Sequence, residues 1–512
     1  MISFIGAAIP LHQARRALRS VFAKRSESVF GMVEGNASTS PFFVGIRPIF
    51  MIKYSGMEDY SGKKILILGL AREGIDSLRY FLEKYPTVQI AAADRAEAGK
   101  LSLAAAELLA RNPQVRFFGG ISYLETLDCY DLIVKSPGIP IHLPSVEAAF
   151  EKGKITSQTE IFFKECPGTI IGVTGTKGKS TTASIIYEII KRSGKKTFLL
   201  GNIGEPMLSY LSRADKDTFF VCELSAHQLY NLKRSPHIAV VTNIYPEHLD
   251  YYKNYNEYIL AKMNICLHQT KNDHFIYNGQ IKEIIPWLKK TKAQKIDFSA
   301  IDWRFEGETA LTGEFNMENA KIGAIVGRLL GVADNVIDAA IADFKPLPNR
   351  LEFVGNFGGI DCYNDSLSTI QESAVAAIEA LGPRVQTLIA GGFDRNQPFD
   401  KLARAVLNSE IRNLVMLPTT GIKIWREIEK QAELSGKVGR FRELECCPAA
   451  NMREAVDLVF AKTEKGKICL LSAAAASFGG FADYADRGRQ FRECLIAGGR
   501  SFAAKDGPKN KK

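Results

Sequence analysis

One short stretch, GVTGTKGKSTTAS at residues 172–184, constrains the fold of this chain more than any other. Residues 169–173 before it are apolar and β-branched, as in a buried strand, and residues 181–192 have the pattern of a helix that ends at Gly194. A glycine-rich turn between a strand and a helix directs backbone N–H groups and the positive helix end toward bound phosphates. The loop departs from the usual consensus, because Val173 stands where a glycine is common. We therefore predict a nucleotide site on an α/β unit.

Seven consecutive residues of this loop are candidate nucleotide contacts. Lys179 would reach the β- and γ-phosphates, and the Ser180 hydroxyl would ligate Mg²⁺. The alternative is a glycine turn that happens to contain lysines, but the order of strand, GKST and helix argues against it. The predicted contacts are Gly175, Thr176, Lys177, Gly178, Lys179, Ser180 and Thr181.

Length, cysteine usage and charge narrow the class of protein. A chain of 512 residues is expected to form about three domains of roughly 150 residues each. No run of 18 apolar residues occurs, so we expect no membrane span. The nine cysteines form no CxxC pair, which favours reduced thiols and a cytoplasmic location. Most of the net charge of +10 lies in residues 1–50 and 500–512, so we expect no nucleic-acid partner.

Three consecutive αβ segments predict an α/β fold of three domains. We expect a Rossmann-like N-terminal domain at 57–155, a central P-loop ATPase-like mononucleotide-binding domain at 156–347, and a Rossmann-like C-terminal domain at 348–500. Residues 1–56 are interpreted as a loose extension rather than a targeting peptide, and residues 501–512 as a disordered basic tail. The expected strands lie at 63–69, 88–94, 130–134, 169–173, 197–200, 219–224, 237–244, and near 385–391, 413–417 and 468–472.

Further motifs follow the phosphate loop in a fixed order. They are GNIG at 201–204, ELSAHQL at 223–229, NIYPEHLD at 243–250, Lys262, GEFNMEN at 313–319, PNR at 348–350, NDS at 364–366 and LLSAAAAS at 470–477. Together with the loop, these motifs resemble those of the Mur ligase family, the ATP-dependent amide-bond enzymes that build the peptidoglycan stem peptide. The resemblance covers roughly residues 57–500.

Within that family, ELSAHQL and the LLS…AS stretch are most similar to the members that add D-glutamate to UDP-N-acetylmuramoyl-L-alanine. The resemblance implies that ATP phosphorylates a carboxylate, and that the amine of the amino acid attacks the acyl phosphate. The implied cofactors are ATP and Mg²⁺, and the implied substrates are UDP-N-acetylmuramoyl-L-alanine and glutamate. We expect a monomer that acts in cytoplasmic peptidoglycan precursor synthesis.

The resemblance also implies a set of catalytic and metal-binding residues. Glu223 would hold Mg²⁺ together with Ser180, and His248 would hold a second Mg²⁺. Lys262 would be carbamoylated, which turns a cation into an oxygen ligand for that metal. Lys179, His248 and Lys262 are the predicted catalytic residues, and the role of Asp250 stays open between orienting His248 and capping a helix.

Three residues outside the loop are predicted to contact ATP. Asn319 would lie near the base, Arg350 near the phosphates and Asp365 at the ribose. The alternative for Asn316 and Asn319 is capping of a helix start. The histidine that usually follows in this motif is Phe315 here.

The remaining candidates are substrate contacts. Asp94 would lie near the uracil of the UDP group, about 20 residues after the glycine-rich turn GLAREG at 69–74. Thr369 has an alternative reading as a capping-box residue paired with Glu372. Contacts to the sugar-peptide part are predicted for Asn202, Ser225 and Gln228, and contacts to the incoming amino acid for Thr369, Arg395, Ser477, Phe478 and Tyr484.

Two departures leave the acceptor open. Leu367 and Ala482 stand where lysines are common in the family, so L-glutamate is the alternative acceptor. A folylpolyglutamate synthase-like ligase is a further alternative, but such enzymes typically read GKGS in a longer loop, where this chain reads GKST. A scaffold without turnover is the alternative from another class, and the intact Lys179, Ser180 and Glu223 argue against it.

Overall fold

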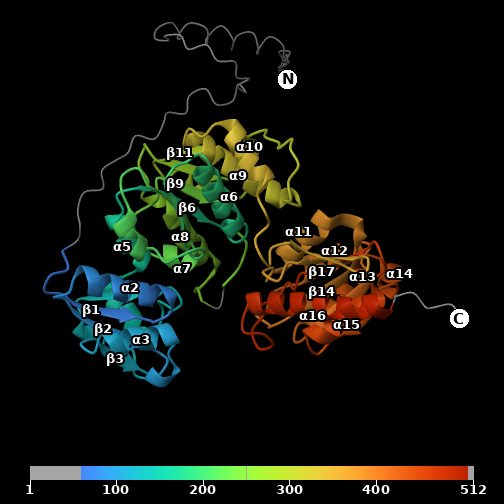
Figure 1. The fold of residues 1–512 in the computed structure, drawn as a ribbon, viewed down its shortest axis with the longest axis horizontal. Coiled ribbons are helices and arrows are strands. Elements are labelled where there is room, and N and C mark those ends of the chain that lie inside the picture. The colour runs from blue at the N-terminus through green and yellow to red at the C-terminus, as the bar shows by residue number, and fades with distance from the viewer. Residues whose placement is uncertain (1–58, 249–250, 506–512) are drawn as a thin grey trace, which may run out of the picture. The chain divides into compact units, whose positions relative to one another are not determined.

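The computed structural model describes residues 59–248 and 251–505, and these residues form two parallel sheets and one mixed sheet, all flanked by helices (Figure 1). The predicted extension at 1–56, Asp250 and residues 506–512 lie outside the described residues. Predicted strands and observed strands coincide within a few residues wherever the sequence has a continuous apolar run.

The first sheet has the order β3-β2-β1-β4-β5, and all its strands are parallel. Its order reverses between β1 and β4, which is the point where open α/β sheets bind ligands beyond the carboxyl ends of their strands. The strands are β1 (Lys64–Leu68), β2 (Gln89–Asp94), β3 (Arg116–Gly119), β4 (Leu132–Lys135) and β5 (Ile155–Thr156). The helices are α2 (Arg72–Lys84), α3 (Leu103–Arg111), α4 (Pro144–Glu151) and α5 (Gln158–Glu165).

The second sheet has the parallel order β11-β10-β9-β6-β8-β7. Strand β6 lies between β8 and β9 and is buried at every position, as its apolar, β-branched sequence predicts. The strands are β6 (Thr169–Thr174), β7 (Thr197–Gly201), β8 (Phe219–Glu223), β9 (Ile238–Val241), β10 (His274–Tyr277) and β11 (Gln294–Asp297). The helices are α6 (Lys179–Arg192), α7 (Ala226–Leu229), α8 (Tyr255–Leu267), α9 (Glu314–Leu329) and α10 (Asp334–Ala342).

The third sheet has the order β12-β13-β17-β14-β15-β16, parallel except for the antiparallel hairpin of β12 and β13. The strands are β12 (Glu352–Phe357), β13 (Ile360–Asn364), β14 (Val385–Gly391), β15 (Asn413–Leu417), β16 (Glu445–Pro448) and β17 (Ile468–Leu471). The helices are α11 (Gln371–Leu381), α12 (Asp400–Leu407), α13 (Gly421–Leu434), α14 (Val438–Arg442), α15 (Met452–Lys462) and α16 (Tyr484–Lys505). Helix α16 covers 501–505, which the sequence analysis had assigned to the basic tail.

Local signals explain where several helices begin. The Asn254 side chain accepts a hydrogen bond from the Glu257 backbone and starts α8, and Ser157 caps α5 in the same way through Glu160. Helix α8 carries Lys262, one of the predicted catalytic residues. Among the described residues, no helix combines the length and the apolar composition that a bilayer crossing requires.

Candidate active site

The loop between β6 and α6 has the backbone that its glycines predict. Gly175 has a φ of +152°, and a Cβ there would lie 1.9 Å from Thr242 Oγ1. Gly178 has a φ of +81°, and a Cβ there would lie 2.7 Å from Asn319 Oδ1. A side chain is excluded at both positions, so the loop can pass close to its neighbours and lead directly into the α6 N-terminus.

Lys179 is the first residue of α6 and lies folded back over the loop. Its Nζ donates to the Thr176 carbonyl at 2.9 Å. Burial lowers the pKa of Lys179, while the nearby carboxylates of Glu223 and Glu247 oppose that shift. The Thr176 hydroxyl is itself held, because it accepts from the Tyr245 N–H at 2.9 Å. The loop therefore presents a half-buried lysine at the end of a parallel sheet.

Ser180 and Glu223 form a buried pair of oxygen donors. The Ser180 Oγ donates to Glu223 Oε2 at 2.5 Å, and the Asn202 amide donates to Glu223 Oε1 at 3.0 Å. Arg350 Nη2 donates to the Ser180 Oγ at 2.5 Å. Residues from four separate motifs thus meet at one hydroxyl and one carboxylate.

Lys262 reaches the same loop from α8. It is buried, its Nζ donates to the Gly175 carbonyl at 2.6 Å, and it lies 4.6 Å from the centre of the Tyr258 ring. Burial, followed by repulsion from Lys179, lowers the pKa of Lys262 well below its usual value. Lys262 therefore lies directly beside the phosphate loop.

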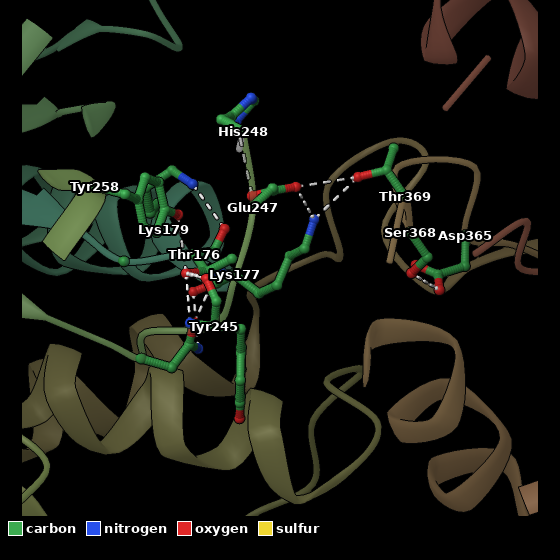
Figure 2. A network of polar contacts seen from close by, with 12 residues as sticks. Thr176, Lys177, Lys179, Tyr245, Glu247, His248, Tyr258, Asp365, Ser368 and Thr369 are labelled. Atoms are coloured by element: carbon green, nitrogen blue, oxygen red, sulfur yellow. Dashed lines mark hydrogen bonds and ion pairs between the residues drawn. The ribbon is translucent and has the colours of Figure 1, made fainter. Parts of the chain in front are cut away.

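Glu247 and His248 follow β9, and Glu247 faces Lys177 and Thr369 (Figure 2). Lys177 Nζ contacts Glu247 Oε1 at 3.0 Å and Thr369 Oγ1 at 3.1 Å. Burial alone would raise the pKa of Glu247, but Lys177, His248 and Lys179 together lower it to about 2. His248 has a φ of +58°, and burial lowers its pKa. Its ring centre lies 5.0 Å from that of His227.

A cleft of about 880 Å³, including open solvent, extends from the loop toward α9 and α11. The predicted ATP contacts Asn319, Arg350 and Asp365 all line it, as does Leu367. Burial raises the pKa of Asp365 to about 6, although Ser472 Oγ donates to its Oδ2 at 2.9 Å. The cleft therefore brings the three predicted ATP contacts outside the loop together beside the phosphate loop.

Asn316 and Asn319 are not helix caps. Helix α9 begins at Glu314 after Gly313, so both asparagines lie inside the helix. The Thr182 Oγ1 donates to Asn319 Oδ1 at 2.9 Å, which fixes α9 against α6 beside the loop. The capping alternative of the sequence analysis is therefore wrong for both residues.

The predicted contacts to the UDP group and the sugar-peptide part lie at the ends of the first and second sheets. Asp94 accepts from the Leu70 N–H at 2.6 Å and so holds the turn after β1. Ser225 and Gln228 form the capping box of α7. Gln228 Nε2 also donates to Glu73 Oε1 at 2.7 Å. Asn202 donates to Glu223, as described above. All four predicted contacts therefore already have hydrogen-bond partners within the protein.

The predicted contacts to the amino acid differ from one another in burial and in their protein partners. Thr369 contacts Lys177 and Glu247, and the residue that precedes α11 is Ile370, so the capping-box alternative for Thr369 is wrong. The Arg395 guanidinium lies 5.2 Å from the centre of the Phe478 ring. Ser477 is buried, and Phe478 and Tyr484 are exposed.

Three residues near these candidates were not identified from the sequence. Glu247 directly precedes His248 in a quoted motif, so its position was a usable signal. Arg72 donates to the carbonyls of Gly201 at 2.6 Å and of Asn202 at 3.2 Å, and it belongs to the turn GLAREG. Arg487 is fully buried and donates from Nη2 to the Ser366 carbonyl at 2.7 Å.

Known protein families match this chain in two regions. Residues 63–156 match the Mur ligase MurD-like, N-terminal domain, and residues 173–306 match the Mur ligase middle domain. These regions contain the first sheet and the phosphate loop with most of the second sheet.

Named relatives align over most of both chains. The UDP-N-acetylmuramoylalanine--D-glutamate ligase of Symbiobacterium thermophilum is 32% identical over 461 residues, which cover 85% of this chain and 98% of the relative. The enzyme of the same name from Lacticaseibacillus casei is 33% identical over 458 residues, covering 85% and 96%.

Solved structures share the fold. The MurF ligase of Thermotoga maritima in complex with ADP gives a TM-score of 0.54 at 15% identity and covers 88% of this chain and all of its own. The UDP-N-acetylmuramate-alanine ligase of the same organism gives 0.52 at 14% identity, covering 85% and 100%. The α/β fold of three domains predicted from the sequence is confirmed. The chain belongs to the Mur ligase family and is an ATP-dependent, amide-bond-forming ligase of peptidoglycan synthesis.

Proposed function

We propose that this ligase adds D-glutamate to UDP-N-acetylmuramoyl-L-alanine through an acyl phosphate, in the cytoplasm and as a monomer. The relatives that carry this activity in their names align over nearly their whole length, which supports the substrate assignment. The structural observation that carries the proposal is the pair of lysines, Lys179 and Lys262, that lie near the Ser180–Glu223 pair and interact electrostatically with the Glu223 carboxylate. Such a site compensates the negative charge that builds up when a phosphoryl group moves onto a carboxylate.

The nucleotide would lie across the loop and the cleft. The loop N–H groups and Lys179 would hold the phosphates, since Lys179 can exchange its bond to the Thr176 carbonyl for a phosphate oxygen. Asn319 would face the base, Arg350 the phosphates and Asp365 the ribose, and all three line the cleft.

The Ser180–Glu223 pair fits Mg²⁺. This ion prefers hard oxygen donors, uses one or two protein ligands and completes its shell with phosphates and water. Within the described residues no cluster of three or more His, Cys, Asp and Glu side chains occurs, which agrees with such a sparse donor set. Bound there, Mg²⁺ would neutralise charge on the ATP phosphates. Ser180 and Glu223 would hold it, and the Asn202 amide would keep the Glu223 carboxylate oriented.

His248 and Lys262 are the proposed residues of a second Mg²⁺ site. Burial favours the neutral amine of Lys262, which is the form that can add CO₂ and lose a proton to give a carbamate. The carbamate oxygens would then be ligands of the kind that Mg²⁺ prefers. Burial also favours the neutral imidazole of His248, the form in which histidine binds metals.

The substrates would approach from two sides. Asp94, Asn202, Ser225 and Gln228 are the proposed contacts of the UDP-linked substrate. The proposed contacts of the amino acid are Thr369, Arg395, Ser477, Phe478 and Tyr484, all of which belong to the region of the third sheet.

The test is phosphate release from ATP in the presence of UDP-N-acetylmuramoyl-L-alanine, with D-glutamate, L-glutamate or no amino acid. Release with D-glutamate alone would support the proposal and show that Leu367 is a tolerated replacement. Release with L-glutamate alone would make L-glutamate the acceptor and leave the rest of the proposed function unchanged. Release only with a reduced folate and glutamate would replace the proposal by the folylpolyglutamate synthase-like reaction, and ATP binding without release by any substrate would indicate a scaffold.

A further inference from the structure

The backbone of Lys177 is held in place inside the phosphate loop. Its N–H donates to Asn243 Oδ1 at 2.7 Å. Its carbonyl accepts from Thr242 Oγ1 at 2.6 Å and from Asn243 Nδ2 at 3.0 Å. The side chain of Lys177 therefore leaves the loop from a fixed point.

From that point the side chain extends away from the nucleotide-facing lysine (Figure 2). Lys177 Nζ lies 3.0 Å from Glu247 Oε1 and 3.1 Å from Thr369 Oγ1, whereas Lys179 Nζ donates a hydrogen bond to the Thr176 carbonyl. Two lysines of one loop thus face different sides. Thr369 belongs to the segment between β13 and α11, which is the proposed acceptor side.

The Lys177 ammonium can donate one more hydrogen bond. It has three N–H donors, and its hydrogen bonds within the described residues go to Glu247 and Thr369. Its side chain is 21% exposed and that of Glu247 is 12% exposed, so a carboxylate arriving there is poorly screened by water. The contact with Glu247 orients the ammonium.

The side chains near Thr369 differ in whether they offer a positive charge to a ligand. Leu367, two residues before Thr369, is apolar and lines the same cleft as Lys177. The Arg395 guanidinium lies over the Phe478 ring. Lys177 is therefore the cation whose contact with Thr369 is already formed.

We propose that Lys177 binds a carboxylate of the incoming amino acid, so that a residue of the phosphate loop controls binding of the acceptor. The inference rests on the proposed function in one respect, namely that the acceptor is an amino acid. A charge-assisted hydrogen bond of this kind is about twice as strong as a neutral one and is expected to affect amino-acid binding more than nucleotide binding.

The test compares Lys177→Met, which keeps the length and removes the charge, with Lys177→Arg, which keeps the charge. Lys196→Met is the matched control, because Lys196 pairs with Asp215 on the exposed surface of the same domain. Initial rates of phosphate release give kcat and the KM values for the amino acid and for ATP. We expect Lys177→Met to raise the amino-acid KM by about 10- to 100-fold, with the ATP KM changed by less than about 3-fold. Lys177→Arg and Lys196→Met should stay within about 5-fold of the wild type.

A second variant tests the position of the charge. Leu367→Lys in the Lys177→Met background puts an ammonium back into the same cleft and should recover at least about tenfold of the lost amino-acid affinity. An ATP KM that rises as much as the amino-acid KM, or an amino-acid KM that does not respond to Lys177→Met, would overturn the proposal. A Lys177→Arg variant as impaired as Lys177→Met would do the same.

The proposed function can fail separately. If the wild type uses neither glutamate but another amino acid, the acceptor assignment falls and the same KM comparison is made with that amino acid. A selective rise in its KM would still support the role of Lys177, and a rise confined to ATP would contradict it.

Discussion

The phosphate loop and the acceptor side of the third sheet differ in how completely their side chains are held. Ser180 and Glu223 are buried and Lys179 is half-buried, and each has at least one hydrogen bond within 3.0 Å. By contrast, Phe478 is 49% exposed and Tyr484 is 42% exposed. The proposed nucleotide side therefore has its polar groups held by the protein itself, whereas the proposed acceptor side leaves large side chains exposed. Preorganised charge acts on the transition state, and an incomplete site acts on binding.

The largest effect is expected from Lys179→Ala, which removes the preorganised cation. Phosphate release should fall by about 1000-fold, because this ammonium would offset charge on the transferring phosphoryl group. Lys191→Ala is the control, since Lys191 lies near the end of the same helix and pairs with Glu188 on the surface. A rate within tenfold of the wild type would contradict the assignment of the phosphate loop.

Ser180→Ala should have the next largest effect. Loss of one oxygen donor is expected to lower the rate by about 100-fold at low Mg²⁺ and to raise the Mg²⁺ concentration needed for half-maximal rate. The rate is measured over a Mg²⁺ titration, with Ser184→Ala, one turn along α6, as the control. An unchanged Mg²⁺ requirement would show that the Ser180 hydroxyl is only structural.

Arg395→Met tests the less organised side. Because the guanidinium would pair with a substrate carboxylate, we expect the amino-acid KM to rise by about tenfold while kcat and the ATP KM stay nearly constant. Lys423→Met, which removes the partner of the neighbouring Asp394, is the control. A fall in kcat without a change in KM would instead indicate that Arg395 acts on the transition state, as proposed for the phosphate-loop residues.

The smallest effect concerns the contact between the first two sheets. Burial raises the pKa of Glu73 from 4.5 to about 7, although the hydrogen bond from Gln228 lowers it. The folded protein then binds a proton between these two pH values and the unfolded chain does not, so stability decreases as pH rises through this window.

Glu73→Gln removes this titration and should flatten the profile. We expect the Tm of the wild type to fall by about 2 °C more than that of Glu73→Gln between pH 5 and 7.5, measured by thermal unfolding. Glu125→Gln, at an exposed position, is the control. Parallel profiles of the wild type and Glu73→Gln would show that the Glu73 carboxyl does not titrate with folding.

The sequence predicts those parts of the fold that have a strong local pattern. Strand β6 is a run of apolar, β-branched residues and was predicted within one residue of its end. Strand β11, QKID, is exposed or half-buried at every position, and β5 has only two residues, so neither has a pattern that distinguishes it from a loop. Such strands form because a neighbouring strand already offers hydrogen bonds, which is a tertiary effect.

In the candidate active site, too, residues with a local sequence signal could be predicted and residues with distant partners could not. The loop residues were predicted because strand, glycines and helix follow one another in the sequence. Arg72 and Arg487 were not, because their partners lie far away along the chain, 129 and 121 residues in two of their hydrogen bonds. Lys177 was assigned to the nucleotide by its position in the motif, and only the structure places its ammonium on Glu247 and Thr369.

The Ser180 hydroxyl has a thermodynamic consequence through its two partners. It donates to Glu223 and accepts from Arg350, which comes from the segment leading into the third sheet. A ligand that replaces Arg350 at this hydroxyl has an affinity that includes the cost of separating the two side chains. Linkage is reciprocal: whatever draws Arg350 away, including an acceptor bound to the third sheet's domain, would tighten nucleotide binding by the same factor by which the nucleotide tightens binding of that acceptor.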